Sequence, residues 1–225
     1  MRTGILFEDA HMMVIHKPAG LAVQSGRIGQ MDCESELKNY LTRKGERPFV
    51  GIVHRLDQPV EGLLVIGKTK AATGALSTQL QRGSLNKSYR AVVHLEGDTP
   101  EDFGSFTDYM VKVGPVAAVV PMDTPDAKKA VLEYEILQKS GDLALVLVHI
   151  ETGRFHQIRC QMAHHQMPLL GDAKYGSSAS KELGHRLGIT QTALCADFLQ
   201  VKHPVTGVEM EFSVQPANKA FSKFQ

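Results

Sequence analysis

The sequence predicts an α+β protein built on a mixed, mostly antiparallel central sheet with flanking helices. Short apolar runs bounded by glycine, proline or polar residues recur along the chain and are typical of β-strands. Several neighbouring runs are separated by only a few residues, which favours antiparallel pairing because parallel strands need long crossovers. Helical periodicity is confined to a few segments between the strands. We expect one domain over residues 1–225, with two lobes around a single catalytic cleft.

The N-terminal segment predicts a hairpin followed by a helix. Residues 4–7 and 12–16 are apolar runs joined by a short polar turn. Lys17-Pro18-Ala19-Gly20 then forces a tight turn, since proline fixes one dihedral and glycine permits an unusual one. Asp32 is a candidate N-cap for a helix that Gly45 ends.

A charged segment lies between two predicted buried strands, residues 49–53 and 63–66. Pro59 cannot donate a ladder hydrogen bond, so the strand must stop or bulge there. Arg55 and Asp57 are therefore presented at the end of a rigid element, where a catalytic acid would be held accurately. Such an Arg-x-Asp pair is more often a structural ion pair, and this stretch alone leaves both interpretations open.

The next segment predicts a helix and then a strand. Thr69 is a plausible N-cap, and Gly83 sits where a C-terminal glycine belongs. Residues 87–93 form the strand, with Tyr89 near its start. A tyrosine between basic residues can stack on a base, although tyrosine at a strand start is more often simply packed.

Residues 97–129 are the least informative segment of the chain. We expect a peripheral hairpin there, formed by residues 109–113 and 116–120. Two further strands over residues 130–137 and 143–150 are joined by a turn that contains glycine, which is a hairpin signal.

A Thr-Gly pair breaks the last of these strands, and the following residues predict a helix. Phe155, Ile158 and Met162 share the face that we expect toward the core. Arg159 lies on another face, from which it can project toward a site.

The same helix raises a metal site as a hypothesis, because His156, Cys160 and His164 are spaced four residues apart. Two successive helical turns converge three ligands on one ion poorly, and no fourth ligand is evident. We therefore expect no metal.

The last two strands are predicted over residues 193–201 and 208–214. The second alternates between apolar and polar side chains. Its inward positions are expected to be Val208, Met210, Phe212 and Val214. The polar tail over residues 216–225 is expected to fray.

Composition is that of an ordinary globular protein and argues against a membrane-spanning helix. Of the 225 residues, 43% are hydrophobic and 22% charged, and no apolar run reaches about 18 residues. The N-terminus lacks the apolar region of a signal peptide, and three widely spaced cysteines favour reduced thiols in the cytoplasm. The net charge is only +1, but residues 62–95 and 152–171 contain no acid. A basic, phosphate-binding face and a solvated mixed surface explain these charges equally well.

Asp57, Tyr89 and Arg159 each offer one functional group at the end of a predicted element. A carboxylate can act as a nucleophile or a general base, and an arginine beside it would hold it ionised. This chemistry allows attack by a carboxylate on a sugar, so a glycosidase acting on free nucleosides is one reading. The residues alone do not select a substrate.

Several ordered motifs resemble those of the RluA family of RNA pseudouridine synthases. They are His16-Lys17-Pro18-Ala19-Gly20-Leu21, His54-Arg55-Leu56-Asp57, Lys87-Ser88-Tyr89, residues 152–159, residues 166–176 and residues 203–207. The resemblance covers roughly residues 4–215 and implies the pseudouridine synthase fold.

The resemblance also implies roles for individual residues. Asp57 is the expected catalytic aspartate, Tyr89 would stack on the target base, and Arg159 would pair with Asp57. Arg55 would fill the space left by the flipped nucleotide, as the base must leave its stack to be reached. The further RNA-binding residues are expected to be His54, Arg154, His156, Lys87 and Arg90. The implied partner is ribosomal or transfer RNA, with no cofactor, metal, DNA or membrane, and we expect a monomer.

The sequence departs from the family pattern at three points. Val60 and Glu61 stand where the family usually has Thr-Ser, and Phe155 stands where a small hydroxyl residue is common. Many relatives carry an N-terminal S4 RNA-binding module, whereas this chain is expected to start directly at the catalytic domain. An RNA-binding or chaperone protein of the same fold without turnover is therefore the alternative.

Overall fold

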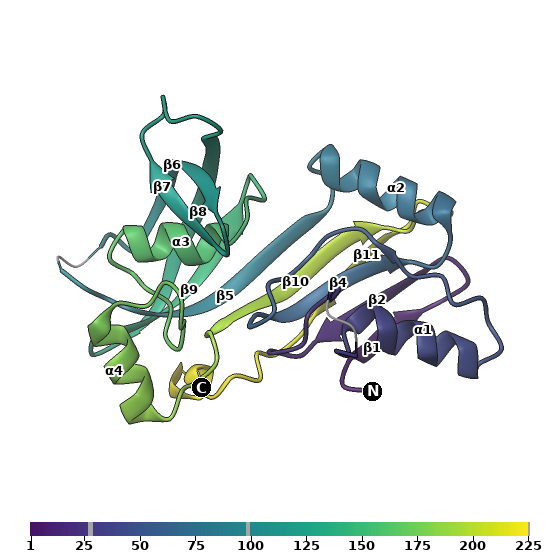
Figure 1. The fold of residues 1–225 in the computed structure, drawn as a ribbon, viewed down its shortest axis with the longest axis horizontal. Helices are drawn as coiled ribbons and strands as arrows, with labels where there is room; N and C mark the ends of the chain where they lie inside the picture. The colour runs from purple at the N-terminus through teal and green to yellow at the C-terminus, as the bar shows by residue number, and fades with distance from the viewer. Residues whose placement is uncertain (27–28, 98–99, 225) are drawn as a thin grey trace. The chain divides into compact units, whose positions relative to one another are not determined.

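The computed structural model describes residues 1–26, 29–97 and 100–224. They form two compact units (Figure 1). Unit 1 comprises Met1–Lys87 and Cys195–Pro216, and unit 2 comprises Ser88–Leu194 and Ala217–Gln225. That both belong to a single catalytic domain around one cleft stays a prediction.

Unit 1 is built on a mixed sheet in the order β1-β2-β4-β10-β11, with β3 also paired to β4. The strands are β1 (Gly4–Glu8), β2 (Met12–Lys17), β3 (Gly51–Ile52), β4 (Glu61–Gly67), β10 (Leu194–Lys202) and β11 (Glu209–Ser213). Their pairings are antiparallel except β4 with β10, which is parallel. One face of this sheet buries a core that includes Met12, Leu63, Leu76 and Leu199.

Two capped helices flank this sheet, α1 (Cys33–Arg43) and α2 (Lys70–Gln81). The Asp32 side chain accepts from the Ser35 amide at 2.7 Å, and Thr69 Oγ1 accepts from the Ala72 amide at 3.1 Å. These are the predicted N-caps, and each satisfies an amide that the helix leaves unpaired. Gly83 follows α2 with a φ of 68°, the left-handed conformation that glycine adopts freely.

Unit 2 carries an antiparallel sheet in the order β5-β9-β8-β6-β7. The strands are β5 (Asn86–His94), β6 (Phe103–Val113), β7 (Val116–Val120), β8 (Lys128–Ser140) and β9 (Leu143–Ile150). The predicted hairpins β6–β7 and β8–β9 are both confirmed. The first is less peripheral than expected, because β6 is long and also pairs with β8. Residues 98 and 99, within the segment 97–129, lie outside the described residues.

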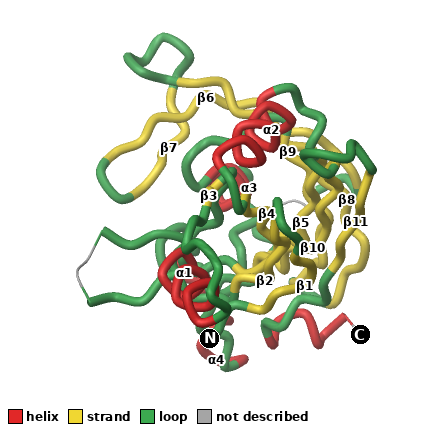
Figure 2. Tube along the Cα trace, turned by 90° about the vertical axis from the view of Figure 1, so that its right-hand side faces the viewer, coloured by secondary structure: helices red, strands yellow, loops and turns green. Residues whose placement is uncertain are grey.

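The helices of unit 2 are α3 (Gln157–His164), α4 (Ser178–Leu187) and the short 3-10 helix η1 (Lys219–Phe224). Helix α3, one of the helices drawn in red in Figure 2, contacts the β6–β7 hairpin. A small core that contains Met110, Ala117 and Cys160 lies at this contact. Helix α4 is absent from the sequence-based prediction, yet its signals are present. Ser177 Oγ accepts from the Ser180 amide at 2.9 Å, and Gly188 ends the helix with a φ of 68°.

Two expectations about the C-terminal strands and tail are wrong. Val208 is 59% exposed, since β11 begins only at Glu209, whereas Met210, Phe212 and Val214 do pack against the core as predicted. The tail does not fray over residues 217–224, because η1 buries Phe221. Residue 225 lies outside the described part.

The α+β class and the mixed, mostly antiparallel pairing are confirmed. The predicted strand over residues 49–53 is shorter than expected, since only Gly51 and Ile52 pair with β4. Within the described residues, no helix is long and apolar enough to cross a membrane.

Candidate active site

Asp57 lies in a turn between β3 and β4 of unit 1. The Val60 amide donates to the Asp57 carbonyl at 3.1 Å. The neighbouring Gln58 is tied to Gly20 twice: its carbonyl accepts from the Gly20 amide at 2.8 Å, and its Nε2 donates to the Gly20 carbonyl at 3.2 Å. The predicted tight turn after β2 therefore fastens the loop that carries the half-buried Asp57. A side chain on a braced loop keeps a defined direction, as catalysis requires.

Lys17 is a further brace of this loop, although sequence reasoning gave it no role. Its side chain is fully buried, and its ammonium donates to the carbonyls of Pro18 at 3.0 Å, Leu21 at 2.8 Å and Gln58 at 3.2 Å. A buried ammonium needs such partners to offset its desolvation. Because one of them is the carbonyl next to Asp57, Lys17 connects the two turns.

Glu61 adds a buried carboxylate at the start of β4. It is 3% exposed, and its Oε2 lies 3.9 Å from His16 Nε2. Burial lowers the pKa of Lys17 to about 8, against the opposing charges of Cys33, Asp57 and Glu61. Burial also lowers the pKa of His16, and here too Glu61 opposes the shift. The acid that replaces the family's usual serine is thus inside unit 1, beside the imidazole of His16.

His54 is buried in unit 1, with 8% of its surface exposed. Its Nε2 accepts from the Val65 amide of β4 at 3.3 Å, so the ring proton is assigned to Nδ1. Burial and then the charge of Lys87 hold the pKa of His54 well below its usual value. A neutral imidazole bonded to β4 braces the Asp57 loop, and this position argues against the expected direct contact with RNA.

Two expected RNA-binding residues of unit 1 are more accessible. Arg55 is exposed, and its guanidinium donates to the side-chain oxygen of Gln24. Lys87 is half-buried at the start of β5, and burial lowers its pKa.

Tyr89 and Arg90 lie on β5 in unit 2, where Tyr89 is opposite Val148 of β9. Tyr89 is 5% exposed and Arg90 is half-buried. Most of the tyrosine ring is therefore covered, as the packed interpretation expects. Its stacking on a base stays a prediction.

Arg159 projects from α3 into the interior of unit 2, where it forms a bidentate ion pair with Asp172. Its Nε and Nη2 lie 2.6 and 2.8 Å from the two carboxylate oxygens, and the side chains are 2% and 0% exposed. Burial alone would raise the pKa of Asp172, but the bonds from Arg159 and the amides of Lys174 and Tyr175 lower it. Asp57 belongs to the other unit, and its pairing with Arg159 stays a prediction.

The chain enters α3 through a tightly bonded turn. Gln157 Oε1 accepts from the Arg154 amide and from the Thr152 hydroxyl, both at 2.9 Å, while its Nε2 donates to the Val131 carbonyl at 3.0 Å. His156 adopts a φ of 54°, which is unusual for a residue with a side chain. This turn replaces the helical turn that the sequence pattern predicted over the same residues.

Phe155 is consequently exposed, and its predicted inward position is wrong. The helix starts only at Gln157, so helical periodicity does not apply to Phe155, which is 39% exposed. Its ring stacks on His156 with centroids 3.8 Å apart. His156 itself is 9% exposed, and its Nδ1 lies 2.7 Å from the Tyr175 hydroxyl, which accepts from the Ala117 amide.

The hypothetical metal ligands have other neighbours. His156 bonds to Tyr175, and the Cys160 thiol donates to a backbone carbonyl at 3.4 Å. His164 instead lies near Asp108 and His165, with candidate ligand atoms within 4.8 Å of one another. Two of these groups are hydrogen-bonded to each other, since His165 Nε2 lies 3.0 Å from the Asp108 carboxylate.

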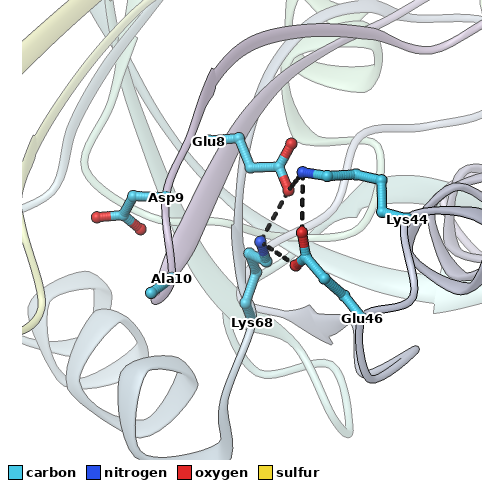
Figure 3. Close-up of a pocket in the computed structure, with 6 residues that line it drawn as sticks. All are labelled: Glu8, Asp9, Ala10, Lys44, Glu46 and Lys68. Carbon is cyan, nitrogen blue, oxygen red and sulfur yellow. Dashed lines mark hydrogen bonds and ion pairs between the residues drawn. The ribbon is translucent and has the colours of Figure 1, made fainter.

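A pocket of about 350 Å³ lies elsewhere in unit 1 and contains none of the predicted site residues (Figure 3). Two carboxylates, Glu8 and Glu46, face two ammonium groups, Lys44 and Lys68, at 2.7–2.9 Å. Burial opposes the shift, but hydrogen bonds from Lys68, Lys44 and Tyr40 lower the pKa of Glu8 to about 2. These charges satisfy one another, and we read the pocket as structural.

The family model for RNA pseudouridylate synthase matches residues 11–164, which include Asp57, Tyr89 and Arg159. The chain belongs to this family.

Curated relatives and solved structures agree with this assignment. Over 92% of its length the chain is 34% identical to ribosomal large subunit pseudouridine synthase D of Vibrio parahaemolyticus and 36% identical to that of Pseudomonas aeruginosa. It spans 65% and 66% of those proteins. Two solved human structures share the fold, each with a TM-score of 0.76 over 95% of this chain. Human RNA Pseudouridylate Synthase Domain Containing 1 is 19% identical and is covered to 83% of its length. Human RNA Pseudouridylate Synthase Domain Containing 4 is 23% identical and is covered to 89%.

Membership in this family confirms the resemblance that the ordered motifs predicted. Lys17, Asp172 and Tyr175 are the residues whose importance sequence reasoning missed. All lie within the motifs that carry the resemblance, yet only the hydrogen bonds identify what they do.

Proposed function

We propose that the protein is an RNA pseudouridine synthase that isomerises specific uridines in structured ribosomal or transfer RNA. The observation that carries this proposal is the position of Asp57. It lies on a loop that the buried Lys17 braces, in a chain of the pseudouridylate synthase family. The curated relatives are named for the large ribosomal subunit, which favours ribosomal RNA as the substrate.

The proposed reaction breaks the bond between N1 of uracil and C1′ of the ribose, and forms a bond from C5 to C1′. C5 loses a proton and N1 gains one, so atoms and charge balance without a redox cofactor or a metal. Asp57 is the proposed nucleophile or base, Tyr89 supports the flipped base, and Arg159 orients the aspartate. Burial of Arg159 beside Asp172 favours a fixed guanidinium for this task.

The proposed RNA-facing residues are Arg55, Lys87, Arg90 and Arg154. The exposure of Arg55 and Arg154 supports direct contact with phosphates or with the space left by the flipped base. His54 and His156 are buried, which favours a supporting position behind Arg55 and Arg154. We also propose a monomer that works in the cytoplasm on RNA rather than DNA.

Tritium release from C5-labelled uridine in unmodified transcripts of cellular RNAs tests the proposal. Wild type should release tritium from at least one transcript, and Asp57→Asn should lose nearly all release. Asp102→Asn is the matched control, because this carboxylate is 73% exposed and belongs to unit 2. Equal release by wild type and Asp57→Asn would refute the catalytic role of Asp57.

A protein that binds RNA without turnover is the second candidate, and Glu61 is the observation that favours it. A carboxylate buried where the family usually has serine could alter the Asp57 loop. In that case no transcript releases tritium, and replacing Val60 and Glu61 with Thr and Ser should restore release. A nucleosidase would instead liberate free uracil.

A further inference from the structure

Phe155 is an exposed aromatic ring on unit 2 with a charged cover. One face stacks on His156, with centroids 3.8 Å apart and ring planes 22° apart. The Lys112 ammonium from β6 lies over the ring at 4.8 Å from its centroid. Since the imidazole fills one face, the ammonium must occupy the other. The tip of a flexible side chain thus lies over the outer face of Phe155, and 39% of the residue is exposed.

The inner support of this ring is rigid. His156 is held in the left-handed conformation, its Nδ1 lies 2.7 Å from the Tyr175 hydroxyl, and that hydroxyl accepts from the Ala117 amide at 2.7 Å. The Arg159 guanidinium lies 5.1 Å from the centroid of the Tyr175 ring. Strained backbone that surrounding contacts hold in place is a common feature of binding sites. Phe155 is therefore the outer layer of a fixed stack.

Three segments around this stack carry cations. Residues 109–122, 127–132 and 152–171 have no aspartate or glutamate. Contacts join them: Lys112 covers Phe155, and Arg154 Nε donates to the Lys129 carbonyl at 2.8 Å. An exposed aromatic ring with a lysine over it and an arginine next to it in the chain matches the chemistry of single-stranded nucleic acid binding.

We propose that Phe155 stacks on an unpaired base of the RNA substrate while Lys112 moves from the ring to a neighbouring phosphate. The choice of RNA as the partner rests on the proposed function. A lysine over an exposed ring is attracted more weakly than a stacked base, so the exchange is favourable. It also gives the ammonium a stronger partner, because a phosphate is fully charged. An acidic peptide would satisfy Lys112 and Arg154 but would leave the ring unused.

The first test measures the affinity of the whole protein for a fluorescein-labelled 12-nucleotide oligouridylate. Phe155→Ala should weaken binding about 5- to 150-fold, the range that loss of one stacked base predicts. Phe155→Leu keeps an apolar cover and should bind nearly as weakly. Phe155→Thr, which restores the residue type common in the family, should do the same. Phe103→Ala is the matched control, because Phe103 is on the same strand as Lys112 and is 73% exposed.

The second test replaces single uridines by abasic sites. An abasic site at one particular position should weaken binding by the wild type about as much as Phe155→Ala does. The same abasic site should not weaken binding by Phe155→Ala any further. A salt titration with the intact oligouridylate tests Lys112. In Lys112→Gln, the slope of log affinity against log salt concentration should fall by the amount expected for the loss of about one phosphate contact. Equal losses for Phe103→Ala and Phe155→Ala, or additive losses at every abasic position, would overturn the proposal. So would equally strong competition by an oligoglutamate peptide.

Tritium release separates this inference from the proposed function. If wild type releases tritium but Phe155→Ala binds like wild type, the stacking inference fails and the isomerase stands. If the losses of affinity from the abasic site and from Phe155→Ala are not additive while no transcript releases tritium, the stacking inference holds and the proposed isomerase activity is refuted. If wild type binds no RNA at all, both fail.

Discussion

At the scale of single residues, the Asp57 loop depends on buried charge. Lys17 is fully buried, and its ammonium donates hydrogen bonds to three backbone carbonyls. Burial lowers its pKa from 10.5 to about 8, so the folded protein disfavours the charged form. Between pH 8 and 10.5 the unfolded chain then binds more protons than the folded one. Stability must therefore rise with pH in that window through this group.

Lys17→Met isolates this effect. The free energy of unfolding of wild type minus that of Lys17→Met should increase from pH 8 to pH 10.5, by up to about 3 kcal/mol. Urea unfolding at each pH measures the difference. Lys139→Met is the control, because its ammonium is in water beside the exposed Asp102, and its difference should change far less. If the free energy of unfolding of wild type minus that of Lys17→Met fell over this pH range, burial would not lower the pKa of Lys17.

The Arg159–Asp172 pair carries a second prediction. Asp172→Asn leaves the buried guanidinium without its carboxylate and should lower the free energy of unfolding by about 3–5 kcal/mol. Asp102→Asn removes a carboxylate that is paired with Lys139 at the surface, and should cost no more than about 1 kcal/mol. Denaturant unfolding compares the two variants. Similar losses would mean that the buried pair is not the support that its geometry indicates.

At the scale of elements, local signals predicted most of the fold. The caps at Asp32 and Thr69 placed α1 and α2, because capping depends only on neighbouring residues. The same reasoning failed at Phe155, because the left-handed His156 and the side-chain bonds of Gln157 delay the start of α3. Gln157 also bonds to Val131, which is distant along the chain, and a helical periodicity pattern contains no information on such a contact.

Helix α2 rests on two glycines, and this contact gives a prediction at the same scale. Gly51 and Gly67 face each other on β3 and β4, and a Cβ on Gly67 would lie 2.2 Å from Thr73 Oγ1 and 2.8 Å from Thr73 Cα. Gly67→Ala should therefore push α2 away and cost about 1–3 kcal/mol of the free energy of unfolding.

Gly74→Ala is the matched control for this prediction. A Cβ at this exposed helical position meets no atom within 4 Å, so the substitution should stabilise the helix by up to about 1 kcal/mol. Thermal unfolding of the two variants should then shift in opposite directions. A shift in the same direction would show that Thr73 gives way and that the close approach is not needed.

At the scale of the whole molecule, the proposed site draws on both units. Asp57 belongs to unit 1, while Tyr89 and Arg159 belong to unit 2. The sequence could indicate these residues only through the order of the motifs, since no local pattern relates positions so far apart along the chain. It could not indicate Asp172 as the partner of Arg159, because that ion pair is made by tertiary packing. The proposed function requires Asp57 and Tyr89 to come within reach of one base.

Cross-linking of introduced cysteines tests this requirement. Asp57→Cys/Tyr89→Cys should react with a short thiol cross-linker to give an intramolecular product, detected by mass spectrometry after digestion. Asp57→Cys/His185→Cys is the control, because His185 is an exposed residue of α4 with no proposed role at the site. The native cysteines interfere little: all three are buried, and burial raises the pKa of Cys33 and that of Cys160, the latter to about 11. Two results would refute the joint action of Asp57 and Tyr89 on a uridine. One is that Asp57→Cys/Tyr89→Cys gives no intramolecular product, and the other is that the two double variants cross-link equally.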